Sequence, residues 1–142
     1  MKQMVPQMRE TGQSVGIEFS YGGFVGNTLD SHRLIWKARE EGGSELQDQV
    51  VESLFKAYFE EEKSLGEHDV LKECAERAGM DATSLLADQS IGRDEVNREM
   101  LEFRNKWKCS GVPMFVIDGT YTLGGAQPPE EILSVLEKSL KN

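Results

Sequence analysis

The stretch of this chain that says most about its chemistry surrounds one proline. In "CSGVPMFVIDGTYTLGGAQ", residues 109 to 127, Pro113 follows Gly111 and Val112 and stands at the start of an apolar run. A cis bond before Pro113 would turn the chain sharply and leave the backbone groups of Val112 open to a peptide-like ligand. The alternative is a trans proline that begins a strand, where its missing N–H costs nothing. These residues alone leave both alternatives open.

The two cysteines, Cys74 and Cys109, are the thiols available for redox chemistry or metal binding. Cys109 lies four residues before Pro113 and could be reactive, but a lone cysteine beside a strand is more often a small buried hydrophobe. Cys74 lies between Leu71 and Ala78 on the apolar face of its predicted helix. Neither has a second cysteine two or three positions away. We therefore expect two core residues, no redox pair and no catalytic residue in this chain.

The two histidines could act as acids, bases or metal ligands. His32 lies in "NTLDSHRLI" and His68 in "LGEHDV", with no cysteine near either. We expect capping or surface histidines and no metal site. The glycine-rich "GGFVG" is not followed by Lys and Ser or Thr in the order of a phosphate-binding loop. The residues by themselves therefore indicate no bound cofactor.

Helices occupy most of the chain before this stretch. Apolar periodicity and capping residues predict helices over residues 4–14, 27–41, 44–59, 70–78, 81–88 and 92–107. Asn27 and Asp81 are the expected N-caps, and Ser44 and Gln47 have the spacing of a capping box. The strand-like pattern begins only after these helices.

The end of the chain is predicted to fold as strand, turn, strand and helix. Asp118-Gly119 separates "PMFVI" from "TYTL", and both central positions of a type I′ turn need a positive φ. The final "PPEEILSVLEKSL" has proline at the helix start and an apolar stripe along one face. This pattern indicates a β-hairpin followed by a C-terminal helix.

The predicted sheet has too few strands. A lone hairpin is marginally stable in water and has open edges, whereas "MFVI" is apolar throughout, as in a strand covered on both faces. Either the short "IEF" segment at residues 17–19 pairs with it, or the missing strands come from another polypeptide. The second case implies a homo-oligomer, a swapped assembly or an N-terminal region that this chain lacks.

Composition excludes several partners. The 142 residues fit one folded domain and carry a net charge of −9, which opposes binding to nucleic acid. No apolar run approaches the length of a membrane span, and "MKQMVPQMRE" has no apolar core of a secretory signal. We expect a cytoplasmic protein with no nucleic-acid or membrane partner, if residue 1 is the natural start.

Four segments together resemble a known family: "FVGNTLDSHRLI", "LFKAYFEEEKSLGEHDVL", "SGVPMFVIDGTYTLGGAQPPE" and the terminal helix. They resemble the DsbA family of the thioredoxin superfamily, in particular its FrnE-like branch, over nearly the whole chain. The resemblance implies an incomplete thioredoxin-like α/β fold that is predominantly helical. Residues 1–108 would be its helical insertion domain, and residues 109–142 the C-terminal half of the thioredoxin-like fold.

The resemblance also implies a substrate-binding site at Gly111, Val112 and Pro113. Pro113 would be the cis-proline that faces the redox centre, and Val112 would present its backbone to a peptide thiol or disulfide, or to glutathione. Family members begin with a strand and a C-x-x-C motif at a helix N-terminus, where the thiolate pKa is lowered. This chain has neither and resembles the C-terminal two thirds of such a protein.

The function implied is therefore that of a thiol-disulfide oxidoreductase family member whose redox dithiol lies outside this chain. Such a polypeptide would not be redox-competent alone. The alternatives are a non-catalytic binding or assembly module and a relative of the glutathione-dependent isomerases and transferases. The expected partners are a peptide thiol or disulfide, or glutathione, together with a second copy or the missing N-terminal strands.

Overall fold

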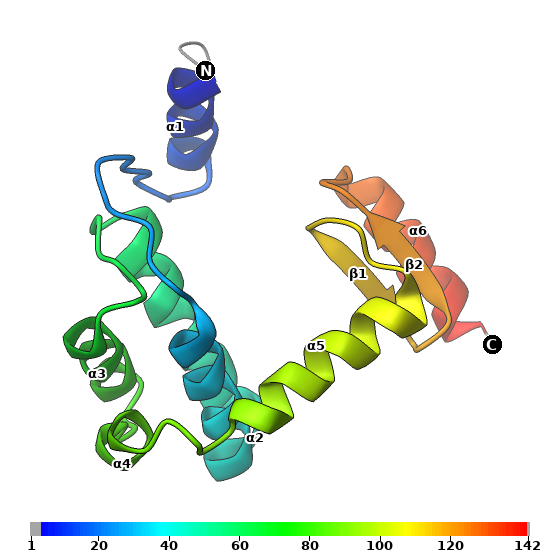
Figure 1. Ribbon diagram of the computed structural model, residues 1–142. Helices are drawn as coiled ribbons and strands as arrows, with labels where there is room; N and C mark the ends of the chain where they lie inside the picture. The colour runs from blue at the N-terminus through cyan, green and yellow to red at the C-terminus, as the bar shows by residue number, and fades with distance from the viewer. Residues whose placement is uncertain (1–3, 142) are drawn as a thin grey trace. The chain divides into compact units, whose positions relative to one another are not determined.

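The computed structural model describes residues 4–141. Their elements, in chain order, are α1 (Met4–Ser14), α2 (Leu29–Phe59), α3 (His68–Arg77), α4 (Thr83–Ala87), α5 (Arg93–Trp107), β1 (Met114–Ile117), β2 (Tyr121–Gly124) and α6 (Pro129–Leu140) (Figure 1). The chain divides between Asn97 and Arg98 into two compact units. The predicted boundary after residue 108 remains a prediction.

The first unit is built around α2, against which α3 and α4 pack (Figure 1). Each of these helices contributes one apolar face to a common core. The buried core residues are Leu34, Ala38, Val50, Leu54, Ala57, Leu71, Cys74, Ala75, Met80, Ala82, Leu85 and Leu86. This unit therefore has a closed hydrophobic core of its own.

The helices predicted over residues 27–41 and 44–59 form one kinked element, α2. Gly43 interrupts its helical geometry with φ 68° and ψ −159°, a backbone conformation that glycine adopts without a steric penalty. The predicted capping box does not use Gln47, whose side-chain amide donates a hydrogen bond to the Ile35 carbonyl at 3.3 Å. Gln47 contacts the preceding part of α2 because the chain bends back at the kink.

The predicted N-caps lie one position too early. Thr28 is the N-cap of α2 and makes no side-chain capping bond, while the side-chain Oδ1 of Asn27 accepts a hydrogen bond from the Leu29 N–H at 2.8 Å. Asp81 accepts from the Thr83 N–H at 2.8 Å in the same way. Both side chains thus form turns with the backbone two residues ahead, just before the helix begins.

The second unit contains the predicted hairpin. β1 and β2 pair antiparallel, from Met114 opposite Gly124 to Ile117 opposite Tyr121, and α6 packs on both strands (Figure 1). Asp118 and Gly119 have φ values of 53° and 59°, as a type I′ turn requires. The sequence pattern located this turn correctly.

The sheet remains incomplete within residues 4–141, where it consists of β1 and β2 alone. Of the two alternatives, the pairing of residues 17–19 with the hairpin is wrong. This segment is not a strand, and directly after it the Ser20 N–H donates to the Phe59 carbonyl at 2.8 Å, at the end of α2. One edge of β1 therefore has no strand beside it in the described part of the chain.

The hairpin unit has no closed core. None of the residues from 98 to 141 is buried, and large apolar side chains of α6 face solvent, Leu133 at 56% and Leu136 at 43% exposure. Phe115 on β1 is 40% exposed. Exposed apolar side chains on so small a unit are typical of a surface that packs against another one. Of the described helices, none is long and apolar enough to cross a membrane.

Candidate substrate-binding site

The candidate site is the loop that joins α5 to β1. The Val112–Pro113 peptide bond in this loop is cis. The Pro113 carbonyl accepts a hydrogen bond from the Gly125 N–H at 2.8 Å, which holds the loop against the end of β2. Gly111, Val112 and Pro113 are all exposed. The three predicted binding residues thus form one surface loop at the start of the hairpin.

Val112 is open to solvent in this loop. The residue is 90% exposed. Among the described residues, no backbone hydrogen bond outside the helices and strands involves the N–H or C=O of Val112. An extended peptide that lies beside Val112 could satisfy both groups, as an added strand does at a sheet edge. The loop therefore offers one donor and one acceptor to a ligand.

A polar hollow of about 460 Å³ lies beside the loop. Its lining includes Val112 and Pro113 from the loop, and Thr122 and Gly124 from β2. Lys108, just after α5, is the one charged residue that lines this hollow among those described. Val112 therefore borders a space that also has a cation, Lys108, at its border.

A second, more apolar hollow of about 800 Å³ lies on the α5 side of the loop. Met100, Phe103, Cys109 and Val112 are among its lining residues. Cys109 is half-buried, and its thiol donates to the Gly111 carbonyl at 3.3 Å. The expectation that Cys109 is a core residue is therefore wrong, because its side chain lines a surface hollow.

Cys74 is a core residue, as predicted. Its side chain is 1% exposed, and its thiol donates to the Ser53 carbonyl at a sulfur–oxygen distance of 3.6 Å. Burial raises the pKa of the Cys74 thiol, which disfavours the reactive thiolate. Both cysteines are free. The sequence contains no C-x-x-C motif.

The two histidines make separate contacts in the first unit. His32 Nδ1 lies 2.7 Å from the Thr28 carbonyl, in the first turn of α2. His68 Nε2 lies 2.8 Å from Asp30 Oδ2. Within residues 4–141, no group of three His, Cys, Asp or Glu side chains is arranged to hold a metal ion.

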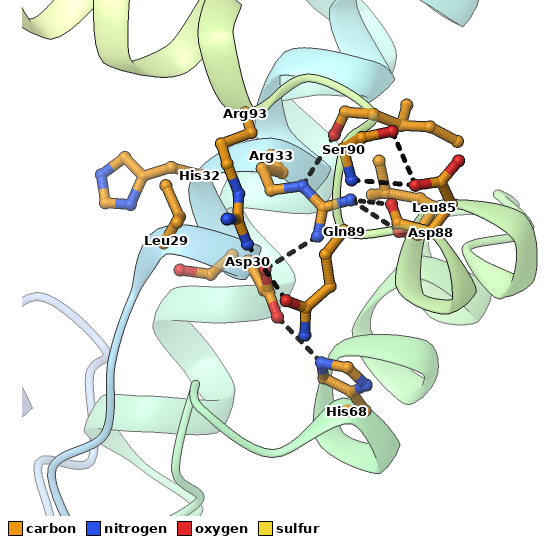
Figure 2. A network of polar contacts seen from close by, with 12 residues as sticks. Leu29, Asp30, His32, Arg33, His68, Leu85, Asp88, Gln89, Ser90 and Arg93 are labelled. Carbon is orange, nitrogen blue, oxygen red and sulfur yellow. Dashed lines mark hydrogen bonds and ion pairs between the residues drawn. The ribbon is translucent and has the colours of Figure 1, made fainter.

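A buried arginine is the largest polar feature that the sequence reasoning missed. Figure 2 shows Arg33 of α2 pointing into the turn that precedes α5. It is fully buried, and it donates to the Leu85 and Ile91 carbonyls, each at 2.7 Å, and to the Asp88 carbonyl. Its ion pair with Asp30, at 2.8 Å, has the i, i+3 spacing of one helix face. That spacing was the available sequence signal.

The charge of Asp30 fits this network. Burial raises the pKa of Asp30, but hydrogen bonds from Arg33 and His68 outweigh it, so that the pKa lies below its usual value. The carboxylate remains ionised and offsets part of the cost of burying the Arg33 guanidinium. The network joins α2, α3 and the turn before α5 (Figure 2).

Comparison with known proteins assigns the chain to a family. The sequence matches the model of the DSBA-like thioredoxin domain over residues 1–137. The structure is similar to that of a probable DsbA oxidoreductase from Streptomyces coelicolor, with a TM-score of 0.87 and 28% sequence identity. The match covers 96% of this chain and 59% of the Streptomyces chain. No curated protein matches the sequence. The fold is thioredoxin-like, mostly helical with a small C-terminal sheet and a final helix, and the chain belongs to the family of DSBA-like thioredoxin domains.

Proposed function

We propose that this chain is the substrate-holding part of a DsbA-type thiol-disulfide oxidoreductase of the FrnE-like branch. The loop at Gly111, Val112 and Pro113 holds the peptide segment around a reacting cysteine, or glutathione. The observation that carries this proposal is the open backbone of Val112, in a loop fixed at the start of the hairpin. Membership of the DSBA-like family supports it.

The loop binds substrate through two backbone hydrogen bonds. The Val112 N–H donates to a carbonyl of the substrate peptide, and a peptide N–H donates to the Val112 carbonyl. This pairing fixes the position of the substrate cysteine along the loop. It depends on the backbone of the peptide, so the site accepts many sequences.

The exchange itself requires a thiolate that attacks a disulfide sulfur and a second thiol that resolves the mixed disulfide. Cys74 is buried, and Cys109 has no second thiol beside it. We therefore assign the dithiol to a C-x-x-C segment outside these 142 residues, and the chain alone is not redox-competent. The sequence upstream in the transcript tests this assignment, because it should encode a strand followed by C-x-x-C.

The free edge of β1 supports the same proposal. A further strand beside β1, provided with the dithiol segment, would extend the sheet and cover the apolar surface of the hairpin unit. A homo-oligomer in which a second copy covers this edge is the alternative arrangement.

A binding experiment tests the site. A capped peptide that contains S-methylcysteine is titrated into the isotope-labelled chain, and amide shifts are followed by NMR. We expect saturable shifts at Gly111 and Val112. The same peptide methylated on the S-methylcysteine nitrogen cannot donate to Val112 and should bind at least about threefold more weakly. Shifts confined to the first unit would contradict the proposal.

A second candidate is a non-catalytic binding or assembly module, which is favoured by the absence of C-x-x-C from the sequence. Both candidates predict peptide binding at Val112 and no insulin reduction by the isolated chain. They differ in the upstream sequence, where the oxidoreductase requires a dithiol and the binding module does not. Preferential binding of S-methylglutathione over the peptide would instead favour a glutathione-dependent enzyme.

A further inference from the structure

The charge around the candidate site differs from that of the whole chain. The chain carries a net charge of −9. Residues 98–113, which lead through α5 into the loop, carry four basic and two acidic side chains. A local excess of positive charge attracts anionic ligands to an otherwise acidic protein. The binding loop is therefore preceded by a basic segment.

Two of these cations already have partners. Arg98 forms an i, i+4 ion pair with Glu102 at 4.0 Å. The Lys106 ammonium lies 4.8 Å from the centre of the Trp107 ring. Arg104 and Lys106 also lie in the last turn of α5, where basic side chains complement the helix dipole. These contacts and the helix dipole explain the basic residues of α5 without a ligand.

Lys108 differs from these residues in its position and in its contacts. It lies beyond the last residue of α5, with a φ of 53°, so that its backbone turns the chain out of the helix and into the loop. Its side chain makes no ion pair or hydrogen bond with the described residues. It lines the same polar hollow as Val112 and Pro113. A ligand paired with Val112 would thus lie in a hollow lined by Lys108, a cation with no ion-pair partner among the described residues.

We propose that Lys108 binds a carboxylate of the thiol or disulfide substrate, so that the site selects substrates with a carboxylate close to the reacting sulfur. This inference rests on the proposed function, since it places the substrate on Val112. The carboxylate can belong to a small thiol such as glutathione or to an acidic side chain beside the cysteine of a peptide. Lys108 is a specificity-determining residue, and the backbone of Val112 remains the anchor.

The test measures dissociation constants from the amide shift of Val112 in the full chain. One pair of ligands is S-methylglutathione and its diethyl ester. The other is a capped peptide with glutamate next to S-methylcysteine, and its glutamine counterpart. We expect the charged member to bind more tightly in at least one pair, and the pair that shows the difference identifies the source of the carboxylate. Raising the salt concentration should reduce that difference.

The variant Lys108→Gln should weaken the charged ligand about two- to fivefold, the range for an exposed ion pair, and leave its uncharged counterpart unchanged. Lys108→Arg should retain the preference. Lys106→Gln is the matched control, because Lys106 is a neighbouring cation that does not line the hollow. This variant should bind both ligands as the wild type does.

Equal binding of charged and uncharged ligands by wild type and Lys108→Gln would overturn the role of Lys108 and leave the proposed function intact. If no ligand shifts Val112 in the wild type, both are overturned.

Discussion

Arg33 is the residue whose removal should cost this protein the most stability. It is fully buried and donates hydrogen bonds to three backbone carbonyls and to the Asp30 carboxylate. Sequence reasoning did not identify it because an arginine in a helical pattern is usually on the surface. Only the folded chain shows that the turn before α5 lies over this position.

Replacing Arg33 by methionine keeps the length of the side chain and removes its donors. The free energy of unfolding should fall by about 3–5 kcal/mol, because three buried carbonyls lose their donor and Asp30 keeps only His68 as a partner. Urea unfolding followed by helical circular dichroism measures this. Arg39→Met, at an exposed position of the same helix, should change stability by no more than about 0.5 kcal/mol. A similar small loss for both variants would contradict the role given to Arg33.

A surface ion-pair cluster should make stability depend on acidity. Hydrogen bonds from Arg77, and next from Lys63, lower the pKa of Glu61 from 4.5 to about 2. Arg77 holds both carboxylate oxygens of Glu61 at 3.0 Å. Since the folded pKa lies below the unfolded one, the stabilisation is fully present above pH 4.5 and is lost as the pH falls toward 2.

The variant Glu61→Gln should therefore lose less stability than the wild type between about pH 5 and about pH 2.5. Urea midpoints at the two pH values measure the difference. The chain has many other carboxylates, so the comparison between variant and wild type is what isolates Glu61. Parallel pH profiles for the two proteins would show that the ion pairs of Glu61 contribute nothing to folding.

The candidate site was predictable in part. Val112 and Pro113 could be located because a proline before an apolar run, followed by a turn, is a local pattern. Lys108 could not, because its role depends on a backbone turn after α5 and on β2, which lies beside it in the polar hollow. Cys109 was misplaced for the same reason: its place just before a predicted strand does not show that a hollow lies beside it.

Among the elements, the hairpin depends most directly on its turn. The positive φ of Gly119 is costly for alanine, although no atom beyond its chain neighbours lies within 4 Å of the place a Cβ would occupy. Gly119→Ala should therefore destabilise the hairpin by about 1–2 kcal/mol. Amide hydrogen exchange in β1 and β2 measures this.

Gly124 provides the matched control for that substitution. It lies at the end of β2, also with open space around its missing side chain, but its φ is not positive. Gly124→Ala should therefore leave exchange in the hairpin nearly unchanged. Equal acceleration by both substitutions would mean that the turn conformation does not limit the stability of the hairpin.

The elements were more predictable than their junctions. Helix and strand types followed from periodicity, since each pattern reflects which face an element buries. The kink at Gly43 and the turns at Asn27 and Asp81 differed from the prediction. At those points a single φ value or one side-chain hydrogen bond decides the geometry, and periodicity carries no information about either.

At the scale of the whole molecule, the two units differ in whether they enclose a hydrophobic core. The first has a buried core, whereas no residue from 98 to 141 is buried. A two-stranded sheet with an open edge is marginal in water. We therefore expect the amides of β1 and α6 to exchange faster than those of α2 in the isolated chain, unless a second copy covers the hairpin.

Solution mass measured against concentration distinguishes these cases. If self-association covers the edge of β1, mass and hairpin protection should rise together as the concentration increases. If a dithiol-bearing segment is required instead, the chain should stay monomeric with an unprotected hairpin. A monomer with a fully protected hairpin would contradict the inference that the hairpin unit lacks a covering partner.

The central claim is that the backbone of Val112 holds the substrate. Its most direct test is the hydrogen exchange rate of the Val112 amide, measured with and without a saturating S-methylcysteine peptide. Pairing with a peptide carbonyl should slow exchange at Val112 by about tenfold or more, since the amide is then protected whenever the peptide is bound. An unchanged exchange rate at Val112 while the peptide is bound would contradict the account.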